Sequence, residues 1–280
     1  SHSVRLGLDR VLTKVMTDSE IKGAILCGEG RAFCAGADVR EFDQAPQAPS
    51  LPDIIRLIEV CPKPVVALIH GVAFGGGLEL ALGCHYRLAG SEARLALPEV
   101  RLGLIPGAGG TQRLPRLVGI DVAIDLVTSG RPMGADEAVA LGLVDALIEG
   151  DEIEFAVDFV DRGSTQLPVP LSQRPSPEDP PTSVFVEKRA SVIRRARGQE
   201  SPLKALESIE FGLSVPFEEG LRNERTVFQA LRTSAQSRAL RHVFFAERAV
   251  AKIPGLENTH ARDIQHLGLV GGGTMGIGIA

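Results

Sequence analysis

The sequence from residue 64 to residue 82 reads Pro64-Val-Val-Ala-Leu-Ile-His-Gly-Val-Ala-Phe-Gly-Gly-Gly-Leu-Glu-Leu-Ala-Leu82. Its opening, Pro64 to Ile69, is a short continuous apolar run, which is typical of a strand buried on both faces of a sheet. The glycines at 75–77 then precede an apolar helix from Leu78 to Leu82. Such a turn exposes backbone N–H groups at a helix N-terminus, where they can hold an anion or a polarised carbonyl. A tight turn selected only for its backbone angles would have the same sequence, so the triplet alone does not establish a site.

Strand and helix patterns alternate around this stretch. Gly23 to Cys27 is a second short apolar run and predicts a buried strand, whereas Val4 to Met16 and Leu51 to Val60 have helical periodicity. Strands that alternate with helices favour right-handed βαβ crossovers, so the predicted fold class is α/β with a largely parallel sheet. Thr111 to Leu147 is predicted to be mostly helical, with a short strand near Leu143 to Ile148.

The composition changes after residue 162. Six prolines between Gly163 and Thr182 predict an extended linker or surface loop. Helices with many arginines are predicted beyond it, over residues 183–197, 202–213, 217–233 and 237–252. Ile264 to Val270 predicts one more strand. Gly271, Gly273 and Gly276 follow it and satisfy G-x-G-x-x-G, the pattern that a dinucleotide-binding fold places directly after a strand.

Composition limits the classes of function. The 280 residues are 44% apolar and 23% charged, the balance of an ordinary soluble globular protein. A net charge of −5 without a lysine-rich tract argues against a nucleic-acid partner. The apolar runs are too short to span a membrane, and no secretory signal peptide opens the chain. The four cysteines, at positions 27, 34, 61 and 84, fit neither a zinc pattern nor a disulfide framework, so we expect a reducing compartment and no metal.

Two glutamates stand in apolar settings. Glu79 is flanked by Leu78 and Leu80, and Glu99 follows Pro98. Burial would raise the pKa of such a carboxyl group towards the range that is useful for acid–base catalysis. Each also has a structural interpretation, because Glu79 could pair with a surface arginine and Glu99 could be an acid stabilised by a helix dipole. His70, at a strand end, is interpreted as a hydrogen-bonded structural histidine rather than a base.

Three segments carry these features together. They are Arg31-Ala-Phe-Cys-Ala-Gly-Ala-Asp-Val-Arg40, the run from His70 to Leu82, and Leu97-Pro-Glu-Val-Arg-Leu-Gly-Leu-Ile-Pro-Gly-Ala-Gly-Gly-Thr-Gln-Arg-Leu114. In combination they resemble the signature of the crotonase (enoyl-CoA hydratase/isomerase) superfamily, and the resemblance extends from about residue 4 to residue 150. It implies a crotonase-type spiral of ββα units. The β-hairpin with which such domains usually open is missing before the first predicted helix.

The resemblance also implies a chemistry. Members with both glutamates at this twenty-residue spacing are typically enoyl-CoA hydratases. Backbone N–H groups of Ala37 and Gly76 would form an oxyanion hole for the thioester oxygen, and Glu79 and Glu99 would activate one water molecule between them. The residues implied to contact the acyl-CoA substrate are Ala35, Asp38, Val39 and Arg40. No cofactor is implied at this site.

The C-terminal part resembles a larger class of enzyme. Residues 216–225 and 237–248 are similar to the linking helices of multifunctional β-oxidation enzymes, in which the hydratase is fused to a 3-hydroxyacyl-CoA dehydrogenase. We therefore expect a hydratase/isomerase domain at 1–182, a helical extension at 183–262 and the truncated start of an NAD-binding domain at 263–280. NAD is implied only for that last part. The resemblance implies the cytoplasm of a bacterium or the peroxisome of a eukaryote.

Other functions stay open at this point. A Δ3,Δ2-enoyl-CoA isomerase needs only one base and would use the same site. A non-catalytic, RNA-binding homologue is disfavoured by the pI near 5.7 and the lack of lysine clusters. An inactive fragment that serves only as a folding unit is a third alternative. The sequence does not determine the acyl chain length or whether the protein is a monomer or a homo-oligomer.

Overall fold

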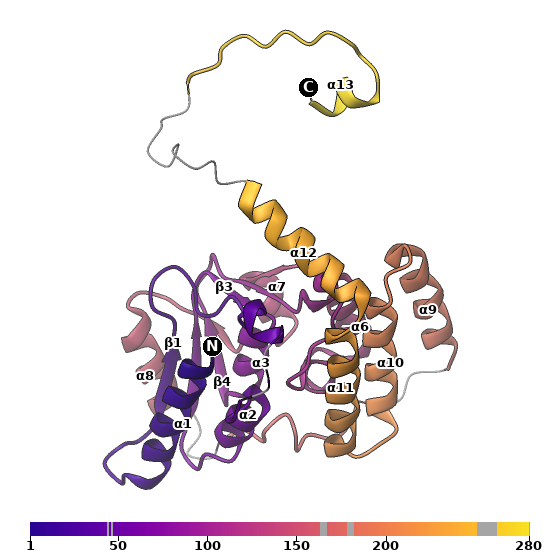
Figure 1. Ribbon diagram of the computed structural model, residues 1–280. Coiled ribbons are helices and arrows are strands. Elements are labelled where there is room, and N and C mark those ends of the chain that lie inside the picture. The colour runs from indigo at the N-terminus through magenta and orange to yellow at the C-terminus, as the bar shows by residue number, and fades with distance from the viewer. Residues whose placement is uncertain (44, 46, 163–166, 178–181, 251–261, 280) are drawn as a thin grey trace. The chain divides into compact units, whose positions relative to one another are not determined.

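The computed structural model describes residues 1–43, 45, 47–162, 167–177, 182–250 and 262–279 (Figure 1). It divides into two compact units, Ser1–His242 and Val243–Ala280. The first unit holds the two sheets of the described residues and the candidate site. Each unit is described by itself.

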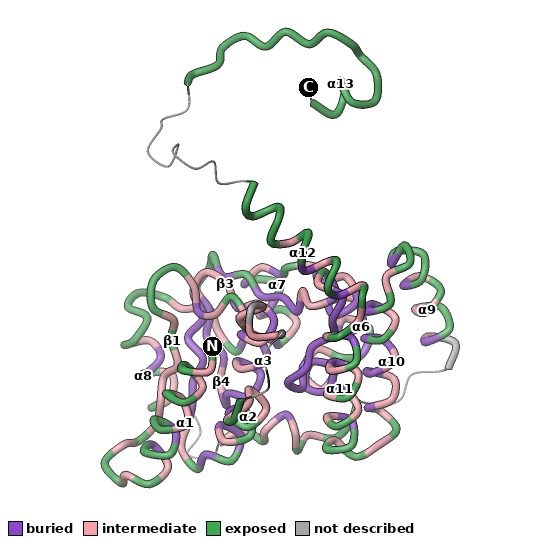
Figure 2. Tube along the Cα trace, in the orientation of Figure 1, coloured by how far each residue is buried: buried purple, intermediate pink, exposed green. Residues whose placement is uncertain are grey.

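A parallel sheet forms the centre of the first unit. Among the described residues it has four strands, in the order β1 (Ala24–Cys27), β2 (Val65–Ile69), β4 (Tyr86–Ala89) and β7 (Ala146–Leu147), and all neighbours are parallel. Every residue of β2 is buried (Figure 2), as expected for an interior strand of a parallel sheet. The strands predicted at 23–27, 64–69 and 143–148 are thereby confirmed.

A second, smaller sheet is formed by strands that are interspersed along the chain with those of the first sheet. It has the order β3 (Val72–Phe74), β5 (Arg94–Ala96) and β6 (Met133–Gly134) in the described part of the chain. β3 and β5 are parallel, and β6 is antiparallel to β5. Only His70 and Gly71 separate β2 from β3, so the chain passes directly from the larger sheet to the smaller one.

Helices of the first half cover these sheets. They are α1 (His2–Thr17), α2 (Leu51–Glu59) and α3 (Gly76–Gly83), with short 3-10 helices η1 (Val39–Asp43) and η2 (Glu99–Leu102). Ser50 caps α2 in a reciprocal capping box with Asp53, which fixes where this helix begins. Ile54, Ile55 and Ile58 of α2 are fully buried in the core. The helices predicted at 4–16 and 51–60 are confirmed.

Most of the following helices contribute buried residues to the same core, whereas the helix over residues 152–162 packs on a second apolar cluster with β2 and β4. They are α4 (Gly110–Arg113), α5 (Pro115–Val118), α6 (Ile120–Ser129), α7 (Ala135–Ala140) and α8 (Glu152–Arg162), then α9 (Thr182–Ala196), α10 (Ser201–Leu213), α11 (Phe217–Arg232) and α12 (Ala235–Val250). α10 contacts α4, α6, α9 and α11. The four helices predicted after the proline-rich segment are therefore present, and they pack against the sheet-containing part of the chain.

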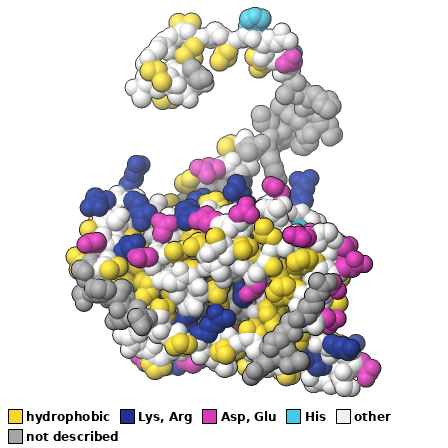
Figure 3. Space-filling view, turned by 180° about the vertical axis from the view of Figure 1, so that it is seen from behind, with side chains coloured by type: hydrophobic (Ala, Val, Ile, Leu, Met, Phe, Trp, Pro, Cys, Tyr) yellow, Lys and Arg dark blue, Asp and Glu magenta, His cyan; other side chains and the backbone are white. Residues whose placement is uncertain are grey.

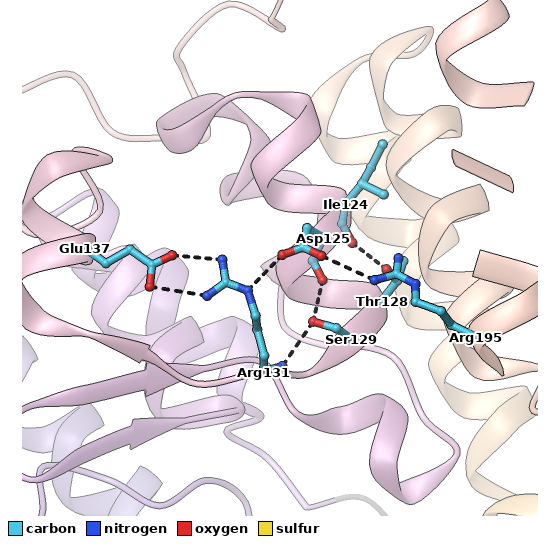
Figure 4. Close-up of polar contacts among 7 residues, drawn as sticks. All are labelled: Ile124, Asp125, Thr128, Ser129, Arg131, Glu137 and Arg195. Carbon is cyan, nitrogen blue, oxygen red and sulfur yellow. Dashed lines mark hydrogen bonds and ion pairs between the residues drawn. The ribbon is translucent and has the colours of Figure 1, made fainter. Parts of the chain in front are cut away.

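A chain of ion pairs also joins the later helices to the earlier ones. Arg195 of α9 lies 3.4 Å from Asp125 of α6, which in turn lies 2.8 Å from Arg131 (Figure 4). Arg131 then pairs with Glu137 of α7 at 2.8 Å. Partly exposed pairs of this kind contribute at most about 1 kcal/mol each, so the buried apolar contacts of α10 hold the helices more strongly.

The second unit corrects one prediction. It contains the end of α12 and the short helix α13 (Thr274–Ile279). Ile264 to Val270, predicted to be a strand, has no regular secondary structure. The prediction is wrong for this structure because a strand requires a hydrogen-bonded neighbour, and no described residue pairs with this segment. Part of the proline-rich segment, residues 163–166 and 178–181, lies outside the described residues; the rest, 167–177, has no helix or strand.

Candidate active site

Three parallel segments end side by side in the first unit. Cys34 forms a parallel bridge with Ala73 of β3, and the N–H of Phe74 donates to the Cys34 carbonyl at 2.9 Å. On the other side of β3, Phe74 is in register with Ala96 of β5, and the N–H of Gly75 donates to the Ala96 carbonyl at 2.8 Å. The residues after each segment therefore leave from one edge, where ligands bind in open α/β sheets. Strand pairing thus brings the three sequence motifs together.

The two predicted amide donors lie close to each other at this edge. A Cβ atom placed on Gly76 would lie 3.6 Å from the nitrogen of Ala37. Gly76 is the first residue of α3, so its N–H has no partner within the helix. In the part of the chain that the structure describes, neither N–H donates to a main-chain carbonyl. The arrangement can present two N–H groups to a single ligand oxygen.

Glu79 lies in the first turn of α3 and is buried. Its Oε1 accepts hydrogen bonds from the N–H of Ala108 at 2.7 Å and of Gly110 at 2.9 Å. Burial raises the pKa of the Glu79 carboxyl, although these two hydrogen bonds and the charges of Arg113 and Arg225 lower it. Glu79 forms no ion pair with an arginine among the described residues, so the alternative of a surface ion pair is wrong.

Glu99 is the first residue of η2, and its carboxyl group faces the turn after β3. A Cβ atom placed on Gly75 would lie 2.9 Å from its Oε1, and Gly75 has φ +55°, a backbone conformation that favours glycine. The Oε2 atom is buried and has no hydrogen-bond partner among the described residues. Burial raises the pKa of Glu99 well above its usual value, and the charge of Glu79 raises it further. Two neighbouring carboxyl groups of this kind favour one protonated and one ionised form, as acid–base chemistry requires.

The loop from Pro106 to Thr111 supplies the donors to Glu79 and is anchored on two sides. Arg113 forms a buried ion pair with Glu59 at 2.7 Å and donates to the carbonyl of Ala108 at 3.0 Å. On the other side, Glu224 of α11 accepts from the N–H of Gly109 at 2.6 Å. Sequence reasoning missed both anchors. Arg113 stood in a quoted motif without a role, and Glu224 stands in a strongly charged helical stretch that gives no sign of burial.

Two buried serines hold η2 through hydrogen bonds to its main-chain carbonyl groups. Ser201 Oγ donates to the carbonyl of Val100 at 3.2 Å, and Ser237 Oγ donates to that of Leu102 at 2.9 Å. Both serines come from helices beyond the proline-rich segment. The helical part of the chain therefore fixes the segment that carries Glu99, and nothing in the sequence distinguished these serines from others.

The remaining predicted site residues are placed as follows. Ala35 is exposed, Asp38 and Val39 are half-buried, and Val39 begins η1 beside the predicted amide donors; the side chain of Arg40 lies outside the described residues. Gly271, Gly273 and Gly276 belong to the second unit. A Cβ atom on Gly276 would lie 1.9 Å from the carbonyl oxygen of Gly271, so this turn is tight, and α13 starts directly after Gly273.

The described residues contain no group of three or more His, Cys, Asp or Glu side chains that could hold a metal ion. None of their helices is long and apolar enough to cross a membrane. The His70 ring lies 3.2 Å from the Gly30 carbonyl oxygen, in keeping with a structural histidine. On the face drawn in Figure 3, Lys and Arg side chains are interspersed with Asp and Glu side chains.

Comparisons with known proteins agree with this geometry. The family model described as enoyl-CoA hydratase/isomerase matches residues 2–158. The chain is 40% identical over 287 residues to a peroxisomal bifunctional enzyme of Danio rerio, covering 100% of this chain and 40% of that protein. It is 37% identical over 287 residues to a fatty acid oxidation complex subunit alpha of Shewanella amazonensis, covering 96% and 41%.

The fold is shared with solved structures as well. A crystal structure of an enoyl-CoA hydratase/isomerase from Pseudoalteromonas atlantica T6c matches with a TM-score of 0.61, 24% identity, and coverage of 88% of this chain and 87% of that one. This likeness supports the fold alone, and it confirms the predicted crotonase-type α/β architecture. The chain spans about two fifths of the length of the two curated relatives.

Proposed function

This chain belongs to the enoyl-CoA hydratase/isomerase family, and we propose that it adds water to trans-2-enoyl-CoA to give 3-hydroxyacyl-CoA in fatty-acid β-oxidation. One observation carries the proposal. The buried carboxyl group of Glu79 and that of Glu99, a half-buried residue whose Oε2 is buried, stand at the same strand edge as the N–H groups of Ala37 and Gly76. A thioester oxygen at those N–H groups would place the conjugated double bond near both acids.

The proposed reaction uses these groups in sequence. The N–H groups of Ala37 and Gly76 donate to the thioester oxygen and stabilise the enolate that forms as water attacks C3. One of the two glutamates removes a proton from the attacking water, a C3–O bond forms, and the C2=C3 π bond breaks. A proton is then delivered to C2. Nothing is oxidised or reduced, and the pair Glu79 and Glu99 returns to its starting protonation.

The thioester would be held by the segment around Ala37, which runs into the start of η1. We assign the CoA-binding role to Ala35, Asp38, Val39 and Arg40, because these residues lie within three positions of the donor Ala37. An acyl-CoA bound there would enter at the carboxyl ends of the strands. Alanine substitution of Asp38 tests this assignment: it should raise KM for the CoA thioester more than it lowers kcat.

The whole protein is proposed to carry a second activity. Two curated relatives are named bifunctional enzyme and fatty acid oxidation complex subunit. Gly271, Gly273 and Gly276 form a tight turn whose backbone lets a diphosphate approach closely, which fits NAD, the redox cofactor of a 3-hydroxyacyl-CoA dehydrogenase. We infer a compartment in which β-oxidation takes place, the peroxisome in a eukaryote or the cytoplasm in a bacterium.

An absorbance assay with two substrates tests the hydratase proposal. The protein should consume a 2-enoyl-CoA with loss of the conjugated thioester absorbance, and the product should be the 3-hydroxyacyl-CoA. A parallel assay with a 3-enoyl-CoA tests for Δ3,Δ2-isomerase activity at the same site. An isomerase would convert this substrate to the 2-enoyl-CoA, so the absorbance of the conjugated thioester would first rise. A folded protein that converts only the 3-enoyl-CoA would be an isomerase, and the hydratase proposal would be wrong.

A further inference from the structure

Glu224 is a buried carboxylate outside the three sequence motifs. It comes from the middle of α11 and is only 1% exposed. Its Oε1 accepts from the N–H of Gly109 at 2.6 Å, and its Oε2 accepts from the N–H of Thr111 at 2.8 Å and from the Thr111 hydroxyl. It forms no ion pair among the described residues. A carboxylate buried in this way has three donors and no cation as partners, a setting that calls for a specific role.

The hydrogen bonds of Glu224 alternate with those of Glu79. Along the loop, the N–H groups of Ala108 and Gly110 point to Glu79, and those of Gly109 and Thr111 point to Glu224. Successive amides thus bind carboxylates on opposite sides of one loop. Any shift of the loop away from Glu224 would move the two donors that hold Glu79.

The identity of the side chain fits this arrangement. A carboxylate is acceptor-only, so both of its oxygens can face N–H donors, whereas a glutamine would turn its NH2 group towards one of them. The neighbouring residue Arg225 donates from Nη1 to the carbonyl of Gly107 at 3.3 Å. Two consecutive residues of α11 therefore bind both kinds of main-chain group of the loop.

Glu224 is also electrostatically connected to the site. The charged groups that interact with it are Glu79 of α3, Glu99 of η2 and the neighbouring Arg225 of α11. Burial raises the pKa of Glu224 to about 8, and the charge of Glu79 contributes to this. The charge of Glu224 in turn raises the pKa of Glu99. The ionisation of Glu224 and that of Glu99 are therefore linked.

We propose that Glu224 is a positioning residue of the active site, which holds the loop from Gly107 to Thr111 so that Ala108 and Gly110 keep Glu79 in place. This inference rests on the proposed hydratase function. The helical part of the chain is, on this account, a working part of the active site.

Glu224→Gln tests the proposal, with Asp145→Asn as a control. Asp145 also accepts from a main-chain N–H, that of Arg87 at 2.7 Å, but it lies at the β4–β7 edge of the larger sheet and, unlike Glu224, forms an ion pair, with the Arg87 side chain at 3.1 Å. In Glu224→Gln we expect kcat to fall about 10- to 100-fold with a smaller change in KM, since misplacing catalytic groups by about 1 Å has effects of that size. The limb of the kcat profile that reports Glu79 should move to higher pH, because a displaced loop withdraws the two main-chain hydrogen bonds that lower the pKa of Glu79. Asp145→Asn should keep the kcat and the profile of the unaltered protein.

Carbon-13 NMR of the glutamate carboxyl groups gives a readout that a purely structural role would not change. In Glu224→Gln the Glu79 carboxyl should titrate at higher pH, because it loses hydrogen bonds from the loop. Unchanged kcat, or a fall in kcat with neither the limb nor this titration moving, would overturn the proposal. Failure of the unaltered protein to hydrate any 2-enoyl-CoA would refute the proposed function instead, and the titration would still decide the role of Glu224.

A second variant covers the case in which Glu224→Gln does not fold. Glu224→Asp keeps the charge, but its shorter side chain cannot reach both Gly109 and Thr111. It should lower kcat and move the limb that reports Glu79 to higher pH. A Glu224→Asp protein with full kcat would show that the hydrogen bonds from Gly109 and Thr111 to Glu224 are not needed for catalysis.

Discussion

Replacing Gly75 by alanine should lower the kcat of the protein strongly while leaving it folded. The new Cβ would lie 2.9 Å from Glu99 Oε1. The carboxylate must retreat by about 0.5 Å to reach ordinary van der Waals separation, which is the tolerance within which catalytic groups have to be held. The backbone at Gly75, with φ +55° and ψ −126°, adds about 1–3 kcal/mol of strain for a residue with a side chain. Because domains are stable by about 5–15 kcal/mol, the variant should still fold.

The expected fall in kcat is about tenfold to a hundredfold, from the displacement of Glu99. Gly119→Ala is the matched control, since Gly119 has φ +81° and no atom within 4 Å of the new Cβ. It should lose about the same 1–3 kcal/mol in a urea unfolding experiment and keep its kcat. Hydration of a 2-enoyl-CoA, normalised to the folded fraction from circular dichroism, measures both variants. Equal kcat in Gly75→Ala and the unaltered protein would refute the reasoning. An equal loss of kcat in Gly75→Ala and Gly119→Ala would refute it as well.

Three further predictions concern the buried charges. Glu79→Gln and Glu99→Gln should each lower kcat for 2-enoyl-CoA hydration by about 10²- to 10⁴-fold, and the loss in the double variant should be much smaller than the product of the two single losses. Stopped assays at saturating substrate would measure these values of kcat. A double-variant loss equal to that product would argue against a shared role. The free energy of unfolding should fall as pH rises from 4.5 towards about 8, because the pKa of Glu224 lies higher in the folded than in the unfolded chain, and urea titrations across this range should show a smaller decline in Glu224→Gln. Arg113→Met should destabilise the protein by about 3–5 kcal/mol in urea, since it leaves Glu59 buried without its partner, and a change below about 1 kcal/mol would contradict this.

The parts of the fold that the sequence predicted well are those with long or strongly apolar patterns. β2 is a five-residue run buried along its whole length, and the pattern of such a strand is visible without neighbours. The helices around it have caps or periodic apolar residues. β3, β5 and β6 are two or three residues long, too short for a period to be read, yet they align the three motifs.

Only the site residues that stand out in their local sequence could be predicted. Glu79 and Glu99 stand out because charged residues are unusual among leucines, alanines and prolines, and burial is what makes them useful. Glu224 lies 115 residues from the glycine that it binds and is preceded by Arg222 and Asn223. Only tertiary packing buries it. Glu224 was missed, whereas the strand from Ile264 to Val270 was predicted but is not formed. An apolar run predicts a strand, but it does not supply the neighbouring strand that is needed for pairing.

Incubation of the protein with but-2-enoyl-CoA in ¹⁸O-labelled water tests the central claim most directly. The account predicts that mass spectrometry will find a 3-hydroxyacyl-CoA carrying one ¹⁸O atom at the hydroxyl group with the unaltered protein, and almost none with folded Glu99→Gln. Unlabelled thioester returned by the folded, unaltered protein at saturating substrate, or equal labelling by the Glu99→Gln variant, would contradict it.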